Sequence, residues 1–326
     1  MVFNTASRPL VSVVTPAYNE EDRIAQCIES VLGQTYQHWD YLIVNNCSTD
    51  RTLEIVQKYA GSDSRIRVIS NGALVPAIAN FNHGLRQISP QSKFCKILFA
   101  DDFLLPECLE RMVALAEANP SVGIVGAYGL QGTWVLWQGV PYGQSVVSGR
   151  EICRQRLLGG PYVFGSATSI LYRSDLVRGR DPFYDESNAH GNDSEACFAL
   201  LKASDFAFVH QILTLSPERE GSMLQTSKQL NASAADILHE LLVFGPYYLT
   251  PQEYSACLKT TLSRYYDFLA TSLLRPRGKA VRDYHKGKLN ENGVAFSRLS
   301  IARAVSRKFA SRLRISSRQS RQLWGL

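Results

Sequence analysis

The sequence predicts an α/β fold, with a mostly parallel central sheet flanked by helices and an all-helical C-terminal extension. Over the first 130 residues, short apolar runs alternate with segments of helical periodicity, an order that builds parallel sheets with helices on both faces. Beyond about residue 225 only helical periodicity remains, so we expect one domain over residues 1–225 and a helical region over 226–326. The chain has 326 residues, of which 45% are hydrophobic and 20% charged, and this composition excludes bulk disorder and allows a full core.

Five apolar runs in the first part are predicted to be buried strands. The spacing of apolar residues between them indicates helices with one buried face. Pro106 is expected at the first position of a helix, where its missing N–H is not needed. The predicted strands are 10–14, 41–44, 65–70, 96–100 and 122–127, and the predicted helices are 20–34, 51–60, 75–88 and the one that begins at Pro106.

The pattern is less regular from residue 128 onward. Residues 128–147 are rich in Gly, Trp and Tyr, which predicts loops with short antiparallel strands. Ser148 and Glu151 have the spacing of a capping box and predict the start of a helix. The remaining predicted elements are a strand near 167–173, a helix near 193–203, a strand near 206–213 and helices at 229–244, 251–273, 276–290 and 296–313.

Several classes of protein are excluded by missing motifs. The seven cysteines are scattered, without CxxC or zinc-type spacing to histidine, which predicts reduced thiols in a cytoplasmic protein. The first residues do not resemble a secretory signal, and no run approaches the roughly 18 apolar residues of a membrane-spanning helix. The chain contains neither GxGxxG nor GxxxxGK[ST], so any phosphate must be bound without a glycine-rich loop.

Positive charge is concentrated at the C-terminal end. From Arg275 onward the chain has 14 Lys/Arg and two acids, whereas residues 1–274 have 21 Lys/Arg and 27 acids. Apolar residues from Leu299 to Leu313 fall near one helical stripe, with basic residues mostly elsewhere, as in a basic amphipathic helix. We expect peripheral contact with a membrane through these helices; a solvated face, or packing on the first domain, is the alternative. No nucleic-acid-binding motif accompanies the charge, so no nucleic-acid partner is expected.

Polar residues follow three of the predicted strands at the point where each strand ends. They are segments 15–20 and 45–50 and the pair Asp101-Asp102. Because ligands in open α/β sheets bind at the carboxyl ends of strands, we expect these segments to converge on one edge. Two adjacent carboxylates suit a hard divalent cation, which can bridge a diphosphate. The alternative is that this pair only begins a loop and caps the next helix.

The order of these segments resembles the family 2 glycosyltransferases, which have the Rossmann-like GT-A fold. The similarity to the opening of that family lies in the run VSVVTPAYNEEDRIAQCIESVLGQTYQHWDYLIVNNCSTDRT. The segment around the family's DxD-type metal motif is similar to KILFADDFLLPECLERMV, and NFNHG (80–84) and FYDES (183–187) with Asn192-Asp193 resemble two further regions. The resemblance covers residues 10–225 and implies transfer of a sugar from a nucleotide-diphosphate donor to an acceptor hydroxyl.

The resemblance implies a donor site at the strand ends. Asn46 would accept from an N–H of the base; it is the second residue of Asn45-Asn46, a pair at which the family usually has Asp-Asp or Asp-Asn. Asp101 would contact the ribose or a metal-bound water, and Asp102 would bind Mg²⁺ or Mn²⁺ together with the diphosphate. Phe99 stands where many relatives have a further aspartate, so one carboxylate is expected to hold the ion. The other implied donor-binding residues are Pro16, Ala17, Tyr18, Glu20, Asn82 and Arg219, the last closing over the diphosphate.

Asp193 is the implied general base, which takes the acceptor proton as the oxygen attacks the anomeric carbon and inverts its configuration. Glu195 is the second choice for this role. The alternative is structural, because Asn192 and Glu195 have capping-box spacing and an acid is favourable in a first helical turn. Structural roles are also the alternative for Glu20 and Arg219, and are expected for Asp50, which would cap the next helix, and for His83 and His190. Trp134 and Trp137 are candidates for stacking on a sugar, with core packing as the alternative.

These observations predict an inverting glycosyltransferase that uses a nucleotide-sugar, with UDP as the expected nucleotide, in cell-surface polysaccharide or glycolipid synthesis. Its expected partners are this donor and a saccharide or glycolipid acceptor, and its expected location is the cytoplasm, with peripheral contact at the inner face of the membrane. The Asn45-Asn46 pair and the single carboxylate expected to hold the metal leave open a non-catalytic nucleotide-sugar-binding protein on the same scaffold. A nucleotidyltransferase is a third alternative, although such enzymes usually have a Gly-rich first loop that is absent here.

Overall fold

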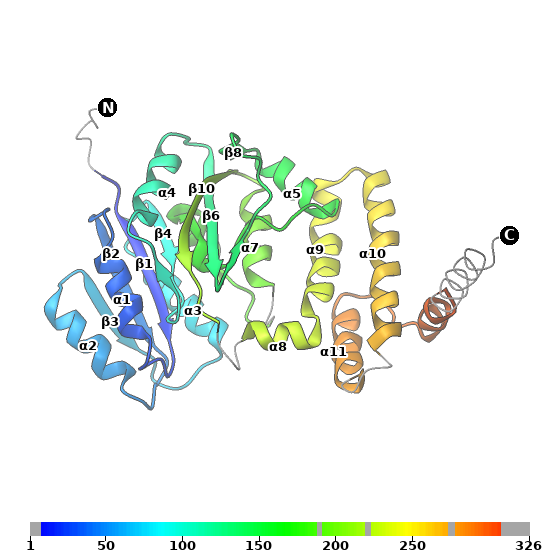
Figure 1. The fold of residues 1–326 in the computed structure, drawn as a ribbon, viewed down its shortest axis with the longest axis horizontal. Coiled ribbons are helices and arrows are strands. Elements are labelled where there is room, and N and C mark those ends of the chain that lie inside the picture. Colours follow the sequence, from blue (N-terminus) through cyan, green and yellow to red (C-terminus); the bar gives the residue numbers. More distant parts are fainter. Residues whose placement is uncertain (1–7, 188–190, 219–222, 273–277, 308–326) are drawn as a thin grey trace, which may run out of the picture. The chain divides into compact units, whose positions relative to one another are not determined.

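The computed structural model describes residues 8–187, 191–218, 223–272 and 278–307 (Figure 1). The chain forms two compact units, residues 1–219 and residues 220–326. The assignment of catalysis to residues 1–225, and of a separate role to 226–326, stays a prediction.

The first unit is built on a mixed sheet that has ten strands among the described residues. The strands are β1 Val11–Ala17, β2 Trp39–Asn45, β3 Ile66–Ser70, β4 Phe94–Ile97, β5 Phe103–Leu104, β6 Val122–Gln131, β7 Trp134–Leu136, β8 Val146–Val147, β9 Ile170–Arg173 and β10 Asp205–Leu215. Their order is β3-β2-β1-β4-β9-β6-β10-β5, with β7 on β6 and β8 on β10. The four strands at one end are parallel, and β9 then pairs antiparallel with both β4 and β6.

Helices pack against this sheet, so the predicted α/β class is confirmed. They are α1 Ile24–Leu32, α2 Thr52–Ser62, α3 Ala77–Arg86, α4 Cys108–Glu117, α5 Gly149–Leu157, α6 Ser174–Arg178 and α7 Asn192–Leu200, with a 3-10 turn, η1, at Ala167–Ser169. Val11 and Val13 of β1 belong to a core shared with α1 and α4. Val14 points to the opposite face and lies close to Gly84 of α3. This alternation along β1 places helices on both faces.

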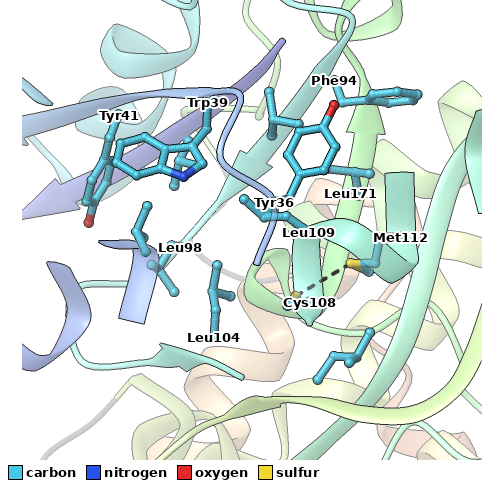
Figure 2. Close-up of a cluster of buried hydrophobic side chains, with 14 of the residues drawn as sticks. Tyr36, Trp39, Tyr41, Phe94, Leu98, Leu104, Cys108, Leu109, Met112 and Leu171 are labelled. Atoms are coloured by element: carbon cyan, nitrogen blue, oxygen red, sulfur yellow. Dashed lines mark hydrogen bonds between the residues drawn. The ribbon is translucent and has the colours of Figure 1, made fainter. Parts of the chain in front are cut away.

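The turn between β4 and β5 is anchored in the core at both ends. Leu98 and Leu104 flank it and are 0% and 4% exposed. Figure 2 shows both leucines among the buried side chains around Tyr41 and Leu109. The pair Asp101-Asp102 lies between them, so the hydrophobic core fixes where these two acids emerge from the sheet.

Local details of the structure differ from some expectations and agree with others. Helix α4 begins at Cys108, two residues after Pro106, because Cys108 N donates to Leu105 O in a preceding turn. Strand β4 ends at Ile97, before the predicted limit of 100, and β5 was not predicted. The capping box at the start of α5 is confirmed on its Ser148 side, since Ser148 Oγ accepts from Glu151 N.

The second unit is helical, as predicted. Its helices are α8 Met223–Leu230, α9 Ala232–Tyr248, α10 Pro251–Ser272, α11 Gly278–Glu291 and a last helical segment, 298–307, while the predicted continuation to 313 lies outside the described residues. His285 is buried, with Nδ1 2.6 Å from Tyr265 Oη and Nε2 2.8 Å from Leu230 O. Burial lowers the pKa of His285. In the described parts of the chain, no helix is long and apolar enough to cross a membrane.

The close contact of α3 with the sheet predicts that Gly84→Ala destabilises the first unit by about 1–2 kcal/mol. A Cβ at this position would lie 2.7 Å from Val14 Cγ1 and 3.0 Å from Val44 Cγ2, and both valines are buried. Overpacking there outweighs the gain in helix propensity. Gly61→Ala in α2 is the matched control, because nothing lies within 4 Å of its Cβ, and this variant should be stabilised. Denaturant unfolding measures both; a stabilised Gly84→Ala protein would contradict the described packing.

Candidate functional site

The loops after β1 and β2 are bonded to each other at the carboxyl edge of the sheet. Asn46 N donates to Ala17 O (2.8 Å), and Asn19 N donates to Ser48 Oγ (3.1 Å). The Asn19 side chain accepts in return from Thr49 N at 2.8 Å. Asn19 has a φ of 54°, a conformation that asparagine adopts more readily than most residues. The two loops therefore form one rigid ledge beside the strand ends.

The backbone of β1 explains how a proline fits inside this sheet. Val14 O accepts from Leu98 N on the β4 side, so Pro16, two residues further, faces the same side. Because β4 has already ended at Ile97, the missing N–H of Pro16 leaves no strand bond unmade. The first strand can thus continue to Ala17 and deliver the next residues to the edge.

The expected nucleoside-binding residues of this loop have different surroundings. Pro16 is partly exposed, Ala17 is 2% exposed and Tyr18 is 43% exposed. The backbone of Glu20 is fixed, because Glu20 N donates to Thr52 Oγ1 at 2.8 Å. The Tyr18 ring is therefore the largest surface that this loop offers to a ligand.

Asn46 is buried and holds a neighbouring segment. Its Oδ1 accepts from Asn71 Nδ2 (2.8 Å) and from Val75 N (3.1 Å), and its Nδ2 donates to Val75 O (2.9 Å). Asn71 also donates to Asn80 Oδ1 and bonds to His83 Nδ1, so His83 belongs to this network. Both acceptor positions of Asn46 Oδ1 are occupied, so an N–H of a base can bond there only if one of these bonds is exchanged. The expected base contact therefore requires movement of segment 71–75.

Asp102 is a buried carboxylate at the end of β4. It is 5% exposed and accepts hydrogen bonds from the Thr168 and Ser216 hydroxyls. Thr168 Oγ1 in turn accepts from Phe99 N at 3.2 Å, which orients its hydroxyl. Burial raises the pKa of Asp102 to about 6, against the two hydroxyls, and the neighbouring charge of Asp101 adds to the rise. The surroundings of this carboxyl therefore favour its protonated form more than water does.

A lysine lies beneath the same strand end. Lys96 of β4 is fully buried, and its ammonium donates to Ile170 O at 3.1 Å. Burial lowers the pKa of Lys96, while the charge of Asp102 acts to raise it. Lys96 also lowers the pKa of Asp102, but the burial of that carboxyl has the larger effect. A buried lysine is thus insufficient to neutralise the site.

The structure links Asp193 to Asp102 through η1. Asp193 Oδ2 accepts from Ala167 N at 3.3 Å, and the next residue, Thr168, bonds to Asp102. Protein surrounds the Asp193 carboxyl closely, although part of the residue remains exposed. Burial raises its pKa, opposed by the Tyr184 hydroxyl and the Ala167 N–H, which both favour the charged form. Two carboxyls with raised pKa values are therefore held by consecutive residues of one turn.

Asn82 fixes the segment that carries Tyr184. Its Oδ1 accepts from Tyr184 N (2.9 Å), and its Nδ2 donates to Tyr184 O (2.8 Å) and Glu186 Oε1 (2.9 Å). Asn82 is 1% exposed, so these partners use its amide in place of a ligand. The structure thus gives Asn82 a positioning role beside the site, and direct contact with the donor stays a prediction.

The expected capping box at the start of α7 is wrong. Gly191, with a φ of 76°, precedes the helix, and Asn192 Oδ1 accepts instead from Asp185 N at 2.9 Å. Glu195 pairs with Arg180, whose Nη2 lies 2.7 Å from Glu195 Oε1. The second choice for the base is therefore engaged by a cation, whereas Asp193 has no ion pair among the described residues.

Several other expected residues lie elsewhere or outside the described chain. Trp137 Nε1 donates to Ser169 Oγ at 2.9 Å, beside η1, and Trp134 is 72% exposed on β7. Arg219 and His190 fall outside the described residues. Over the described ranges, no group of three or more His, Cys, Asp or Glu side chains is arranged to hold a metal ion. A cation here needs ligands from a bound molecule as well as from the protein.

Sequence reasoning missed the hydroxyls that complete the site. Thr168 and Ser216 act on Asp102 and are far from it in the sequence. Tyr184 acts on Asp193 and is near it in the sequence. Tyr184 lay inside a segment singled out for its resemblance, without a role. No local pattern distinguishes such a hydroxyl from an ordinary core residue.

Comparison with known sequences identifies relatives of the first unit. The sequence model of Glycosyl transferase family 2 matches residues 12–178. An uncharacterized glycosyltransferase of Haemophilus influenzae is 36% identical over 120 residues, which is 37% of this chain and 36% of that relative. The putative glycosyltransferase EpsE of Bacillus subtilis is 28% identical over 250 residues, covering 72% of this chain and 87% of its own. The Escherichia coli UDP-Glc:alpha-D-GlcNAc-diphosphoundecaprenol beta-1,3-glucosyltransferase WfgD is 34% identical over 119 residues, or 36% of this chain and 46% of WfgD.

Solved structures share the fold. S. aureus TarS 1–349 in complex with UDP-GlcNAc has a TM-score of 0.62 at 20% identity, covering 91% of this chain and 87% of that one. The mannosyltransferase PcManGT from Pyrobaculum calidifontis, in complex with GDP-Man and Mn²⁺, has a TM-score of 0.57 at 14% identity, covering 98% of this chain and 84% of that one. The predicted GT-A arrangement is confirmed.

The uncompensated burial of Asp102 predicts that Asp102→Asn stabilises the protein above pH 6, by about 1–3 kcal/mol. Because the pKa rises from 3.8 to about 6 on folding, the folded state binds the proton more tightly, and stability falls as pH rises through this interval. The gain should vanish below about pH 3, where the carboxyl is protonated in both the folded and the unfolded state. Denaturant unfolding at about pH 3 and pH 7.5 measures it.

Asp50→Asn is the control, because the pKa of Asp50 is shifted in the opposite direction to that of Asp102. Partial burial raises the pKa of Asp50, but hydrogen bonds from Thr52 and from Glu21 N outweigh it and lower the pKa. This variant should lose stability at pH 7.5. If Asp102→Asn were destabilised as strongly as Asp50→Asn at that pH, Asp102 would not be an uncompensated charge.

Proposed function

The chain belongs to glycosyl transferase family 2, whose sequence model matches half of it, and we propose that it transfers a sugar from a nucleotide-diphosphate donor to an acceptor hydroxyl with inversion. One observation carries the proposal: two consecutive residues of η1, Ala167 and Thr168, bond to the carboxyls of Asp193 and Asp102. The two carboxyls are thereby held close to each other at the carboxyl edge of the sheet. One acid can face the leaving diphosphate and the other the attacking hydroxyl, which is the division of labour that such a displacement needs.

The donor is proposed to lie along the ledge formed by the loops after β1 and β2. The exposed Tyr18 ring offers a surface for the base, and Pro16, Ala17 and Glu20 line the same strand end. Asn46 would bind the base after exchanging its bonds to Val75. UDP is the proposed nucleotide, because the S. aureus structure holds UDP-GlcNAc and the E. coli relative is named for UDP-Glc.

A divalent cation, Mg²⁺ or Mn²⁺, fits the residues present. Asp102 is buried with a raised pKa, and Asp101 adds a second negative charge beside it. A bound cation would therefore stabilise the ionised form of Asp102. Asp102 would hold the ion, with Asp101 contacting the ribose or a bound water. When bound, the cation would neutralise charge on the departing diphosphate. The Mn²⁺ in the P. calidifontis structure supports this, and Arg219 is proposed to approach the diphosphate as well.

Asp193 is proposed as the general base. The acceptor oxygen attacks the anomeric carbon, the bond from that carbon to the diphosphate breaks, and the acceptor proton passes to Asp193. A carboxylate with a raised pKa accepts a proton more readily near neutral pH than an ordinary aspartate does. The bond from Ala167 N holds the carboxylate in place while it does so.

The acceptor is proposed to be a saccharide or glycolipid used in cell-surface polysaccharide synthesis. The E. coli relative acts on a diphosphoundecaprenol-linked sugar, according to its name, and this supports a lipid-linked acceptor. A place at the inner face of the membrane, in the cytoplasm, follows from such an acceptor and remains part of the proposal.

Asp193→Asn should lower transfer by about 10²–10⁴-fold while donor binding is retained, because the amide keeps an acceptor for Ala167 N but cannot take a proton. Nucleotide release from UDP-, GDP- and dTDP-sugars with Mn²⁺ and candidate acceptors measures transfer, and calorimetry measures donor binding. Glu195→Gln is the control and should change turnover much less, since Glu195 is paired with Arg180. No release from any donor by the unmodified protein, with donor still bound, would favour a non-catalytic nucleotide-sugar-binding protein.

Tyr184→Phe should move the acid limb of the pH profile of kcat/KM to higher pH. The Tyr184 hydroxyl lowers the pKa of Asp193, so its removal raises that pKa and leaves less of the base deprotonated at a given pH. Tyr36→Phe is the control, because Tyr36 is buried as well but its hydroxyl donates to Pro9 O and is not a cause of the Asp193 shift. If Tyr184→Phe stays active and its acid limb does not move, the Tyr184 hydroxyl does not set the pKa of the general base.

A further inference from the structure

The helical unit contains a groove with an apolar floor. It has a volume of about 1170 Å³ and is formed by α11 and the segments 295–296 and 298–306. Ile301 is buried beneath it, Phe296 and Val305 are partly exposed, and Ala295 and Ala302 are exposed. The groove thus offers apolar surface to something outside the unit, and it lies within the basic C-terminal helices for which the sequence predicts membrane contact.

The rim of the groove is basic. Arg282 and Lys286 lie on α11 and Arg298 on the last helical segment, and the one carboxylate among the lining residues is Asp283. Asp283 Oδ1 lies 3.6 Å from Arg282 Nε, so this acid offsets part of the charge of one arginine. Lys286 and Arg298 are exposed, and neither has an ion pair with another described residue. Two exposed cations, one on each of the two helical segments, therefore line the groove without an ion pair among the described residues.

The charge of the groove decides between possible occupants. Residues 308–326 of this chain have five Lys/Arg and no acid, so their side chains offer no counter-charge to a basic rim. A nucleic acid would satisfy the cations but would leave the apolar floor without a partner. An anionic phospholipid satisfies both, because its phosphate meets the rim while its glycerol and upper acyl carbons cover Phe296 and Val305.

We propose that this groove docks the protein on bilayers that contain anionic phospholipid, with Arg282, Lys286 and Arg298 against the phosphates and the apolar floor against the acyl boundary. The inference does not depend on the sugar-transfer proposal, because it concerns another unit and another ligand. Each basic residue near an anionic surface contributes about 1 kcal/mol, so three of them correspond to roughly a 100-fold change in affinity.

The test uses the full chain and two kinds of vesicle, one of phosphatidylcholine alone and one in which phosphatidylglycerol replaces part of it. Co-sedimentation should show binding to the second kind only, weakened by salt. The groove variant with Arg282→Gln, Lys286→Gln and Arg298→Gln should bind roughly 100-fold more weakly. The matched control removes three exposed cations of the same unit outside the groove, with Lys259→Gln, Arg264→Gln and Lys279→Gln.

Two further variants keep the proposal testable if the triple variant folds poorly. Asp283→Asn removes the lone carboxylate of the rim and should tighten binding by about 5-fold, a gain that unfolding cannot produce. Ala302→Glu puts a negative charge on the exposed floor and should weaken binding. Equal losses in the groove and control variants, or no gain with Asp283→Asn, would overturn the groove as the docking site. Binding of phosphatidylcholine vesicles equal to that of the anionic ones would overturn the role of its charge.

Discussion

The site depends on the burial of two carboxyls, for which the charge of the nearby Lys96 does not compensate. Burial raises the pKa of both Asp102 and Asp193, and hydrogen bonds from Thr168, Ser216 and Ala167 N only partly oppose it. A protein tolerates such charges where the surrounding structure holds them, and they mark positions where positive charge or a proton is to be received. The proposed chemistry supplies both: a cation with the diphosphate at Asp102, and the acceptor proton at Asp193.

The elements around the site hold these carboxyls in place. The antiparallel entry of β9 brings η1 against the end of β4, and the leucines that flank the Asp101-Asp102 turn anchor it in the core (Figure 2). Asn82 of α3 fixes the backbone of Tyr184, whose hydroxyl acts on Asp193. The donor ledge is coupled to segment 71–75 through Asn46. Donor binding at Asn46 would therefore change the hydrogen bonds that link segment 71–75 to α3, the helix that begins just after it.

The sequence was informative where structure follows from local pattern. Apolar periodicity predicted the strand–helix order, and strand ends predicted where Asp101 and Asp102 lie. It was uninformative where distant segments meet: Thr168 and Ser216 contact Asp102 from 66 and 114 residues away, and the orientation of β9 follows from packing, not from its residues. The predicted capping box at Asn192 was wrong. Gly191 precedes the helix in a left-handed conformation, and the Asn192 side chain accepts from Asp185 N. The basic groove of the helical unit likewise depends on two segments that only folding brings together.

The central claim is tested most directly by anomalous scattering from crystals of the protein soaked with Mn²⁺ and UDP. The account predicts one manganese peak within coordination distance of Asp102, shared with the diphosphate, and an Asp193 carboxylate free of metal. A manganese ion bound by Asp193, or a diphosphate bound away from the Asp101-Asp102 turn, would contradict it.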